Sequence, residues 1–171
     1  MINDNGLKIG IGIGFRRCGS SWLHTILSNQ SAISKTDNGL HYFSYNYAKG
    51  GDWYQEQVRN ENLETHFIDL SVSYSYPEYN KISAKRIKYD LGKPLIFAIV
   101  RNPIERAYSD YLRSLRTAEI KNMSFEKAIV ACPEFIERGK YNTLLAPYAE
   151  HFGIENIRKG IKTVLGTDFQ S

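Results

Sequence analysis

A short glycine-bounded loop near the N-terminus holds the residues best suited to chemistry. It runs from Gly14 to Ser21, reads GFRRCGSS, and lies between an apolar segment and an amphipathic one. Glycines allow a tight turn in which several N–H groups point at one oxyanion, and the helix N-terminus that follows adds partial positive charge. Arg16 and Arg17 add full charges and planar donors that suit phosphate or sulfate. The loop therefore predicts an anion site, with a strand–helix turn carrying solvated arginines as the alternative.

This loop differs from an ordinary ATP site. The Walker pattern GxxxxGK[ST] matches at Gly14 and Gly19, but Ser20 stands where the lysine is required. The buried strand that could supply a magnesium-binding aspartate ends in Arg101 instead. A nucleotide kinase therefore remains only an alternative hypothesis, which magnesium-dependent ATP turnover would reveal.

A second strand–helix junction follows in the middle of the chain. Residues 95–100 (LIFAIV) form a continuous apolar run, as expected of a strand buried on both faces, and Arg101 ends it. Asn102 and Pro103 then begin a helix as N-cap and first residue. Because open α/β sheets bind ligands at the carboxyl ends of their strands, Arg101 is a second anion-binding candidate. The apolar positions of this helix, expected to pack against the sheet, are Ile104, Ala107, Tyr108, Tyr111, Leu112 and Leu115.

The rest of the pattern alternates apolar runs with amphipathic stretches. This predicts an α/β fold, P-loop-like with three α/β/α layers and a parallel sheet of about four or five strands. Further strands are expected at 7–15 and 65–72, and further helices after a cap at Ser20 or Ser21 and at 83–91, 124–131 and 141–152. No strand or helix is predicted after Phe152. The 12 tyrosines gather at 42–54 and 74–79, which indicates either packing or the lining of a cleft.

Bulk composition narrows the class of protein. The 171 residues suit one domain spanning 1–171. A net charge of +4 fits an anionic ligand but is too dispersed to predict a nucleic-acid partner. Cys18 and Cys132 indicate reduced thiols, with no disulfide framework and no metal site. No stretch approaches the ~18 apolar residues of a membrane span. We therefore expect a cytoplasmic protein with no membrane partner.

Taken together, FRRCGSSWL, LHYF and VRNPIERAYSDY resemble the sulfotransferase family, especially its bacterial and glycan-modifying branches. In that family the first loop, PKSGTTWL, holds the 5′ end of the donor 3′-phosphoadenosine 5′-phosphosulfate (PAPS). The second motif, close to RNPxxRAxSxY, matches without a gap and implies that Arg101 and Ser109 bind the 3′-phosphate. Weaker likenesses are Asp69–Tyr74 to an ExTPxY segment and Gly139–Tyr141 to a GxY segment.

The resemblance implies a PAPS-dependent sulfotransferase that acts by in-line displacement on a hydroxyl of a glycan or other small molecule. Arg17 falls at the family lysine that stabilises the leaving oxygen, and His41 is the remaining candidate for the base. The implied donor-binding residues are Arg16, Arg17, Cys18, Gly19, Ser20, Ser21, Trp22, Arg101 and Ser109.

Three departures from the family qualify this expectation. Arg17 keeps the positive charge of the lysine but is a very poor proton donor. Gly39 stands where glycan-modifying members carry a glutamate base, which leaves His41 as either the remaining base or a packed loop histidine. The family's terminal strand and later cofactor loop have no predicted counterpart after Phe152, which suggests a C-terminally truncated domain. We therefore also expect a weak or non-catalytic donor-binding relative, prone to form homo-oligomers at an open sheet edge.

Overall fold

The computed structural model describes residues 8–28, 30, 33–35, 39–58 and 66–162. Five strands form one sheet in the order β2-β3-β1-β4-β5, and every neighbouring pair is parallel. The strands are β1 (Lys8–Gly14), β2 (Ile33–Lys35), β3 (His66–Ser71), β4 (Leu95–Arg101) and β5 (Ile157–Lys162). The predicted α/β fold with a parallel sheet is confirmed, although the three-residue strand β2 was not predicted.

Side chains along β1 alternate between the two faces of the sheet. Ile9, Ile11 and Ile13 are buried in the main apolar core. The glycines between them face the other side, where side chains of the flanking strands lean over β1. A Cβ at Gly12 would lie 2.8 Å from the ring of Phe97. The glycines therefore let large residues of β3 and β4 pack above the central strand.

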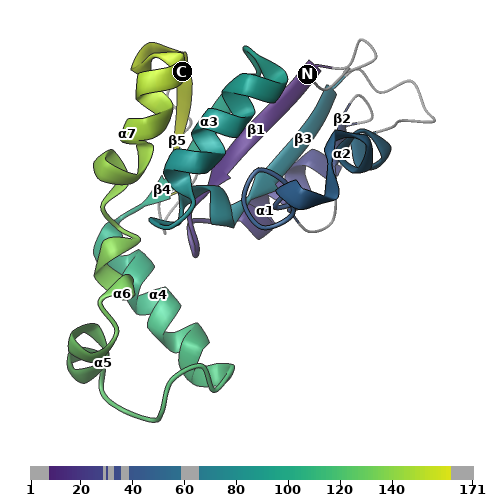
Figure 1. Cartoon of the computed structure of the whole chain (residues 1–171). Coiled ribbons are helices and arrows are strands. Elements are labelled where there is room, and N and C mark those ends of the chain that lie inside the picture. The colour runs from purple at the N-terminus through teal and green to yellow at the C-terminus, as the bar shows by residue number, and fades with distance from the viewer. Residues whose placement is uncertain (1–7, 29, 31–32, 36–38, 59–65, 163–171) are drawn as a thin grey trace.

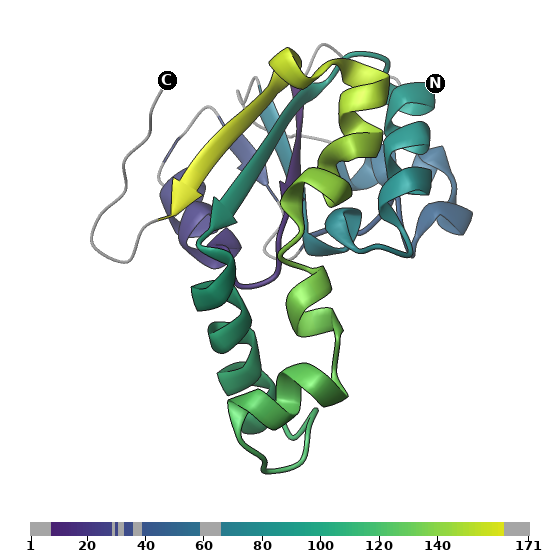
Figure 2. The same cartoon turned by 90° about the vertical axis from the view of Figure 1, so that its left-hand side faces the viewer.

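Helices cover both faces of the sheet, as Figure 2 shows. On one face lie α2 (Gly51–Val58), α3 (Asn80–Leu91) and α7 (Tyr141–Phe152), of which α2 was not predicted. The opposite face carries α1 (Ser20–Ser28), which begins at Ser20, so neither serine precedes the helix as its cap.

Three tyrosines of the two crowded stretches belong to the main core. Tyr42, Tyr54 and Tyr74 are at most 2% exposed and pack with Phe43. The packing interpretation is confirmed for these three residues.

The face of the sheet that carries α1 has an apolar hollow beside this helix. Its volume is about 690 Å³, and its apolar walls include Leu23, Leu27, Ile68, Phe97, Ile99 and Ile157. Association through an apolar surface stays a prediction.

The segment from α4 to α6 projects away from the sheet and is called the arm here; the rest is the body (Figures 1 and 2). The arm comprises α4 (Pro103–Arg116), α5 (Phe125–Ala131) and α6 (Glu134–Glu137). It has a small apolar core of its own, made by Ala107, Tyr111, Ala128 and Phe135.

The prediction that the apolar positions of α4 pack against the sheet is wrong. Ile104, Tyr108 and Leu112 are 73%, 48% and 40% exposed. The helix runs out beyond the carboxyl end of β4 (Figure 1). Its covered sides face α5, α6 and the loop that follows β1, and not the sheet.

The prediction that no strand follows Phe152 is also wrong. After a short 3-10 turn (Ile154–Asn156), β5 pairs with β4 from Ile96↔Ile157 to Arg101↔Lys162. Its sequence, IRKGIK, lacks the apolar run of a central strand because β5 lies at the sheet edge. Exposed Arg158 and Lys159 are typical of edge strands that resist further pairing. Across the described residues, no helix has the length and apolar character needed to span a membrane.

Candidate functional site

The predicted site residues gather at the carboxyl edge of the sheet. Because β1, β3 and β4 are parallel, their carboxyl ends lie side by side, with Gly14 opposite Ile99. The loop from Phe15 to Ser21, called the glycine loop here, follows β1, and Arg101 ends β4. His41 joins the same edge because its backbone N–H donates to Ser71 Oγ at the end of β3, over 2.9 Å.

The glycine loop is a tight turn with unusual backbone angles. The N–H of Cys18 donates to the carbonyl of Phe15 over 3.0 Å. Arg17 has a φ of 70° and Gly19 a φ of 103°. Positive φ is costly for a residue with a side chain and tends to occur at functional sites. Among the described residues other than glycine, only Arg17, His41 and Ala118 have positive φ. Two of these three are the residues predicted to be catalytic.

Arg17 connects the two sequence motifs. Its Nε donates to Ser109 Oγ over 3.0 Å, across 92 residues of sequence. Burial lowers the pKa of Arg17, Asp110 raises it, and the guanidinium groups of Arg113, Arg116 and Arg16 lower it further. Burial is the main cause of the lowering, while the three neighbouring guanidinium groups place positive charge near Arg17 that favours an anion.

Tyr141 ties the glycine loop to the second junction. Its hydroxyl donates to the carbonyl oxygen of Arg101 over 2.7 Å and lies 3.5 Å from Cys18 Sγ. Its ring packs edge-on against Phe15, with 4.8 Å between centroids. Arg101 itself pairs with Glu105 over 3.1 Å. We did not predict Tyr141 as a site residue, although its GxY segment was the available signal.

The cap of α4 fixes where the second junction turns. The side chain of Asn102 accepts hydrogen bonds from the N–H groups of Ile104 and Glu105, at 3.0 and 3.3 Å, and Pro103 begins the helix. This confirms the start predicted from sequence. It also sets Ser109 on the turn of α4 that faces the glycine loop.

Arg16 makes contacts that the sequence did not predict. Its guanidinium pairs with Asp110 over 2.5 Å and with Glu119 over 2.6 Å. The guanidinium that we predicted to bind the donor is thus paired with two carboxylates of this chain. Its role as a donor ligand stays a prediction.

Hydrogen bonds around His41 define which ring nitrogen carries the proton. Ser44 Oγ donates to the carbonyl of His41 over 3.0 Å, so it must accept from Ser73 Oγ, 2.5 Å away. With its only proton used, Ser73 must accept from His41 Nδ1 at 2.6 Å. His41 Nε2 is therefore the unprotonated nitrogen. Burial lowers the pKa of His41, which keeps the ring neutral near pH 7.

The position of the missing glutamate is sterically closed. A Cβ at Gly39 would lie 2.6 Å from the carbonyl oxygen of Leu70 and 2.8 Å from Ser71 Cα. The loop approaches the backbone of β3 so closely that no side chain fits. His41 is thus the candidate base that remains at this end of β3, because the buried carboxylate of Asp69 is bonded to Ser71 and Tyr74.

Three predicted donor ligands lie in the first turn of α1. Ser20 and Trp22 are partly buried and Ser21 is exposed. In any α-helix the first N–H groups have no partner within the helix and point toward the residues that precede it, which is the arrangement that binds oxyanions. Their individual roles stay predictions.

The fold and the site define an α/β domain with a cationic site at the carboxyl edge of its sheet, where strands lead into helices. No family model matches the chain. Mouse heparan sulfate glucosamine 3-O-sulfotransferase 5 is 32% identical over 117 residues, which are 67% of this chain and 33% of that protein. The bifunctional heparan sulfate N-deacetylase/N-sulfotransferase 1 of Xenopus tropicalis is 27% identical over 151 residues, 79% of this chain and 17% of that protein. The chain thus spans a third or less of the length of these relatives.

A solved structure has the same fold. The sulfotransferase from Alicyclobacillus acidocaldarius superimposes with a TM-score of 0.73 at 22% identity, over 91% of this chain and 72% of that one. With the similarity to the heparan sulfate enzymes, this identifies the chain as a sulfotransferase-like domain. The family predicted from the motifs is confirmed.

Proposed function

We propose that this domain binds PAPS and transfers its sulfuryl group to a hydroxyl of an acceptor. The observation that carries the proposal is the Arg17–Ser109 hydrogen bond, which joins the two motifs into one cationic site. When bound, the donor supplies a sulfuryl group attached to a good leaving group, 3′-phosphoadenosine 5′-phosphate (PAP). The acceptor oxygen–sulfur bond forms as the sulfur–oxygen bond to the phosphate breaks.

The charges around Arg17 fit such a donor. Arg17 and the N–H groups of Gly19 to Ser21 would hold the sulfate end, while Arg101 and Ser109 would hold the 3′-phosphate. The N–H of Cys18, which we also predicted as a donor ligand, is bonded to the carbonyl of Phe15. Spread negative charge at a transferring group is best stabilised by fixed donors of this kind. Ser109 keeps the Arg17 guanidinium near the loop, and Tyr141 fixes the backbone of Arg101 beside it.

The proton of the acceptor hydroxyl would pass to His41. Its Nε2 is unprotonated, because Nδ1 donates to Ser73, and burial favours the neutral ring. A neutral imidazole held in one tautomer is suited to act as a general base near pH 7.

For the acceptor we propose a glycan hydroxyl. The relatives are named for sulfation of heparan sulfate, and we extend that class of acceptor to this chain. Transfer of labelled sulfate from PAPS to heparan chains, compared with a simple phenol, tests this extension. A cytoplasmic location is proposed on the sequence alone.

A donor-binding protein without catalysis is the second candidate. It is favoured by Gly39, where the family base is absent and the backbone leaves no room for it. Binding of PAP without measurable transfer from PAPS would select this candidate.

Calorimetry with PAP and AMP tests donor recognition. PAP should bind more tightly than AMP, and Arg101→Ala should remove most of the difference, since a buried charge pair of this type contributes ~2–5 kcal/mol. Lys140→Gln, which breaks an exposed ion pair with Glu137, is the matched control. Equal affinities of the unmodified protein for PAP and AMP would rule out the proposal.

Substitution of Arg17 tests the chemical step. Arg17→Ala should lower the turnover rate much more than donor affinity, because the charge matters most as the leaving oxygen develops negative charge. Arg17→Lys should preserve or raise activity. A lysine variant as inactive as the alanine variant would show that the loop functions only with arginine.

A further inference from the structure

Arg16 belongs to a network of charges that crosses from the glycine loop to the arm. We call the network of Arg16, Arg106, Asp110 and Glu119 the charge clamp. Asp110 is fully buried and contacts Arg16 at 2.5 Å and Arg106 at 3.1 Å. Arg106 is also fully buried and donates to the carbonyl of Phe135 in α6. Arg138, just after α6, is the third guanidinium group that pairs with Asp110, at 3.6 Å. A buried carboxylate among three guanidinium groups fixes the relative positions of the segments that carry them.

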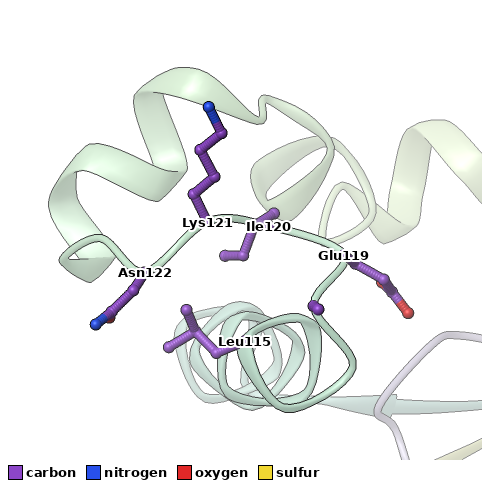
Figure 3. A pocket seen from close by; sticks show the side chains of 6 residues that line it. Leu115, Glu119, Ile120, Lys121 and Asn122 are labelled. Carbon is purple, nitrogen blue, oxygen red and sulfur yellow. The ribbon is translucent and has the colours of Figure 1, made fainter.

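Glu119 is the outer end of the clamp, just beyond α4. It accepts from Arg16 and Arg113, each at 2.6 Å, and from Ser114 at 3.0 Å. Figure 3 shows that its carboxylate points away from Leu115 and from the hollow after α4. That hollow is lined by Leu115, Ala118, Glu119, Ile120, Lys121 and Asn122. Although desolvation raises it, hydrogen bonds from Arg16, Thr117 and Ser114 hold the pKa of Glu119 at about 2.

The clamp runs parallel to the contact that joins the two motifs. Arg16 and Arg17 are neighbours in the loop, and Ser109 and Asp110 are neighbours on α4. Arg16 holds Asp110 while Arg17 holds Ser109. Arg16 thus sets the position of α4 against the glycine loop, and with it the separation of the two predicted anion subsites.

We infer that Arg16 is a positioning residue: through Asp110 and Glu119 it fixes the distance between the subsite for the 5′ end of the donor and the subsite for the 3′-phosphate. This inference rests on the proposed function. A ligand that bridges two subsites gains affinity from their fixed separation, whereas a ligand of either subsite alone does not.

Three nucleotides separate positioning from direct contact. Affinities of PAP, 5′-AMP and 3′-AMP are measured by calorimetry for the unmodified protein, Arg16→Gln and Arg16→Lys. For Arg16→Gln we expect PAP affinity to fall on the order of 10- to 100-fold, the effect of a small misplacement, while both monophosphates change little. The PAP affinity of Arg16→Lys should lie between those of the unmodified protein and Arg16→Gln. Lysine keeps the positive charge but lacks the planar guanidinium that pairs with two carboxylates.

Other outcomes overturn the inference. If Arg16 contacts the donor directly, Arg16→Gln should lower the affinity for 5′-AMP as much as the affinity for PAP. If the role is only structural, the melting temperature should fall while all three affinities below it stay unchanged. Glu119→Gln, on the exposed end of the clamp, provides a second variant that should fold, and it should weaken PAP selectively in the same direction. Lys140→Gln is again the control for removal of an ion pair.

The wild-type measurements separate this test from that of the proposed function. If the unmodified protein fails to prefer PAP over both monophosphates, the proposed function fails before any variant is compared. Hydrogen exchange of the free protein then still tests the clamp itself. Faster exchange at Phe15–Ser21 and in α4 of Arg16→Gln, with the body unchanged, is expected; uniform exchange would exclude the clamp.

Discussion

In the body, the largest buried groups are apolar or aromatic: Ile11, Phe43 and Phe67 are at most 1% exposed and share one core with the helices that cover the sheet. In the arm, the largest fully buried side chain is Arg106, paired with the equally buried Asp110. The body is thus held together by apolar packing and strand pairing, whereas the arm is held by a small apolar core and the charge clamp. The site lies where the two meet, so one half of it depends on packing and the other half on ion pairs.

The largest effect is expected from removal of the buried charge in the arm. Asp110→Asn leaves Arg16, Arg106 and Arg138 without their shared carboxylate, and breaking a buried ion pair typically costs ~3–5 kcal/mol. Urea denaturation should show this loss. Limited proteolysis should cut first within α4 to α6. Glu137→Gln, at an exposed pair, should cost no more than ~1 kcal/mol. Equal losses for the two variants would contradict the contrast between body and arm.

A carboxylate at Gly39 tests the packed half of the site. Gly39→Glu should destabilise the body by ~1–3 kcal/mol, because the new Cβ meets backbone atoms of β3 that cannot move aside easily. Thermal unfolding measures the loss, and Gly39→Ala should share most of it. We expect no gain in sulfate transfer. A stable Gly39→Glu variant with higher turnover would mean that the loop adjusts and that the family base can be restored.

The serine pair around His41 should give a smaller change in stability. Ser73→Ala removes the acceptor of the Nδ1 proton, which typically costs ~0.5–1.5 kcal/mol. The freed ring can then change tautomer, so turnover should fall while PAP affinity stays the same. Steady-state kinetics with calorimetry separates the two. Ser75→Ala, whose hydroxyl bonds only to Val72 among the described contacts, is the control.

Acidification should change the stability of the arm and of the body in opposite directions, through Glu119 and Asp69. The pKa of Glu119 is about 2 in the folded arm against an ordinary 4.5, so its stabilisation is complete above about pH 4.5 and is lost as pH falls toward 2. Burial raises the pKa of Asp69 in the body, despite hydrogen bonds from Ser71 and Tyr74 that lower it. The folded body therefore binds that proton more tightly, and acidification through the raised pKa favours folding at this position.

Hydrogen exchange between pH 6 and pH 3 measures both regions at once. We expect the arm to lose protection first, and Glu119→Gln to remove the part of this pH dependence that comes from Glu119. Loss of protection in body and arm at the same pH would show that the arm does not respond separately.

The sequence by itself determined the elements that local patterns encode. The apolar run of β4, the cap at Asn102 and the glycine loop each follow from neighbouring residues, because capping, turns and strand burial act over a few positions. The two motifs were also enough to indicate Arg17, Arg101 and Ser109 as candidate anion ligands and to predict the family, since each motif is a continuous stretch of the chain.

Only the tertiary structure decided which of these residues meet. Arg16 pairs with Asp110 across 94 residues of sequence, and no local pattern predicts a contact at that separation. The closure of Gly39 depends on the backbone of β3, and the edge strand β5 is held by pairing with β4 rather than by its own composition. The exposed face of α4 has the same cause, since periodicity shows that a helix has an apolar side but not which element covers it.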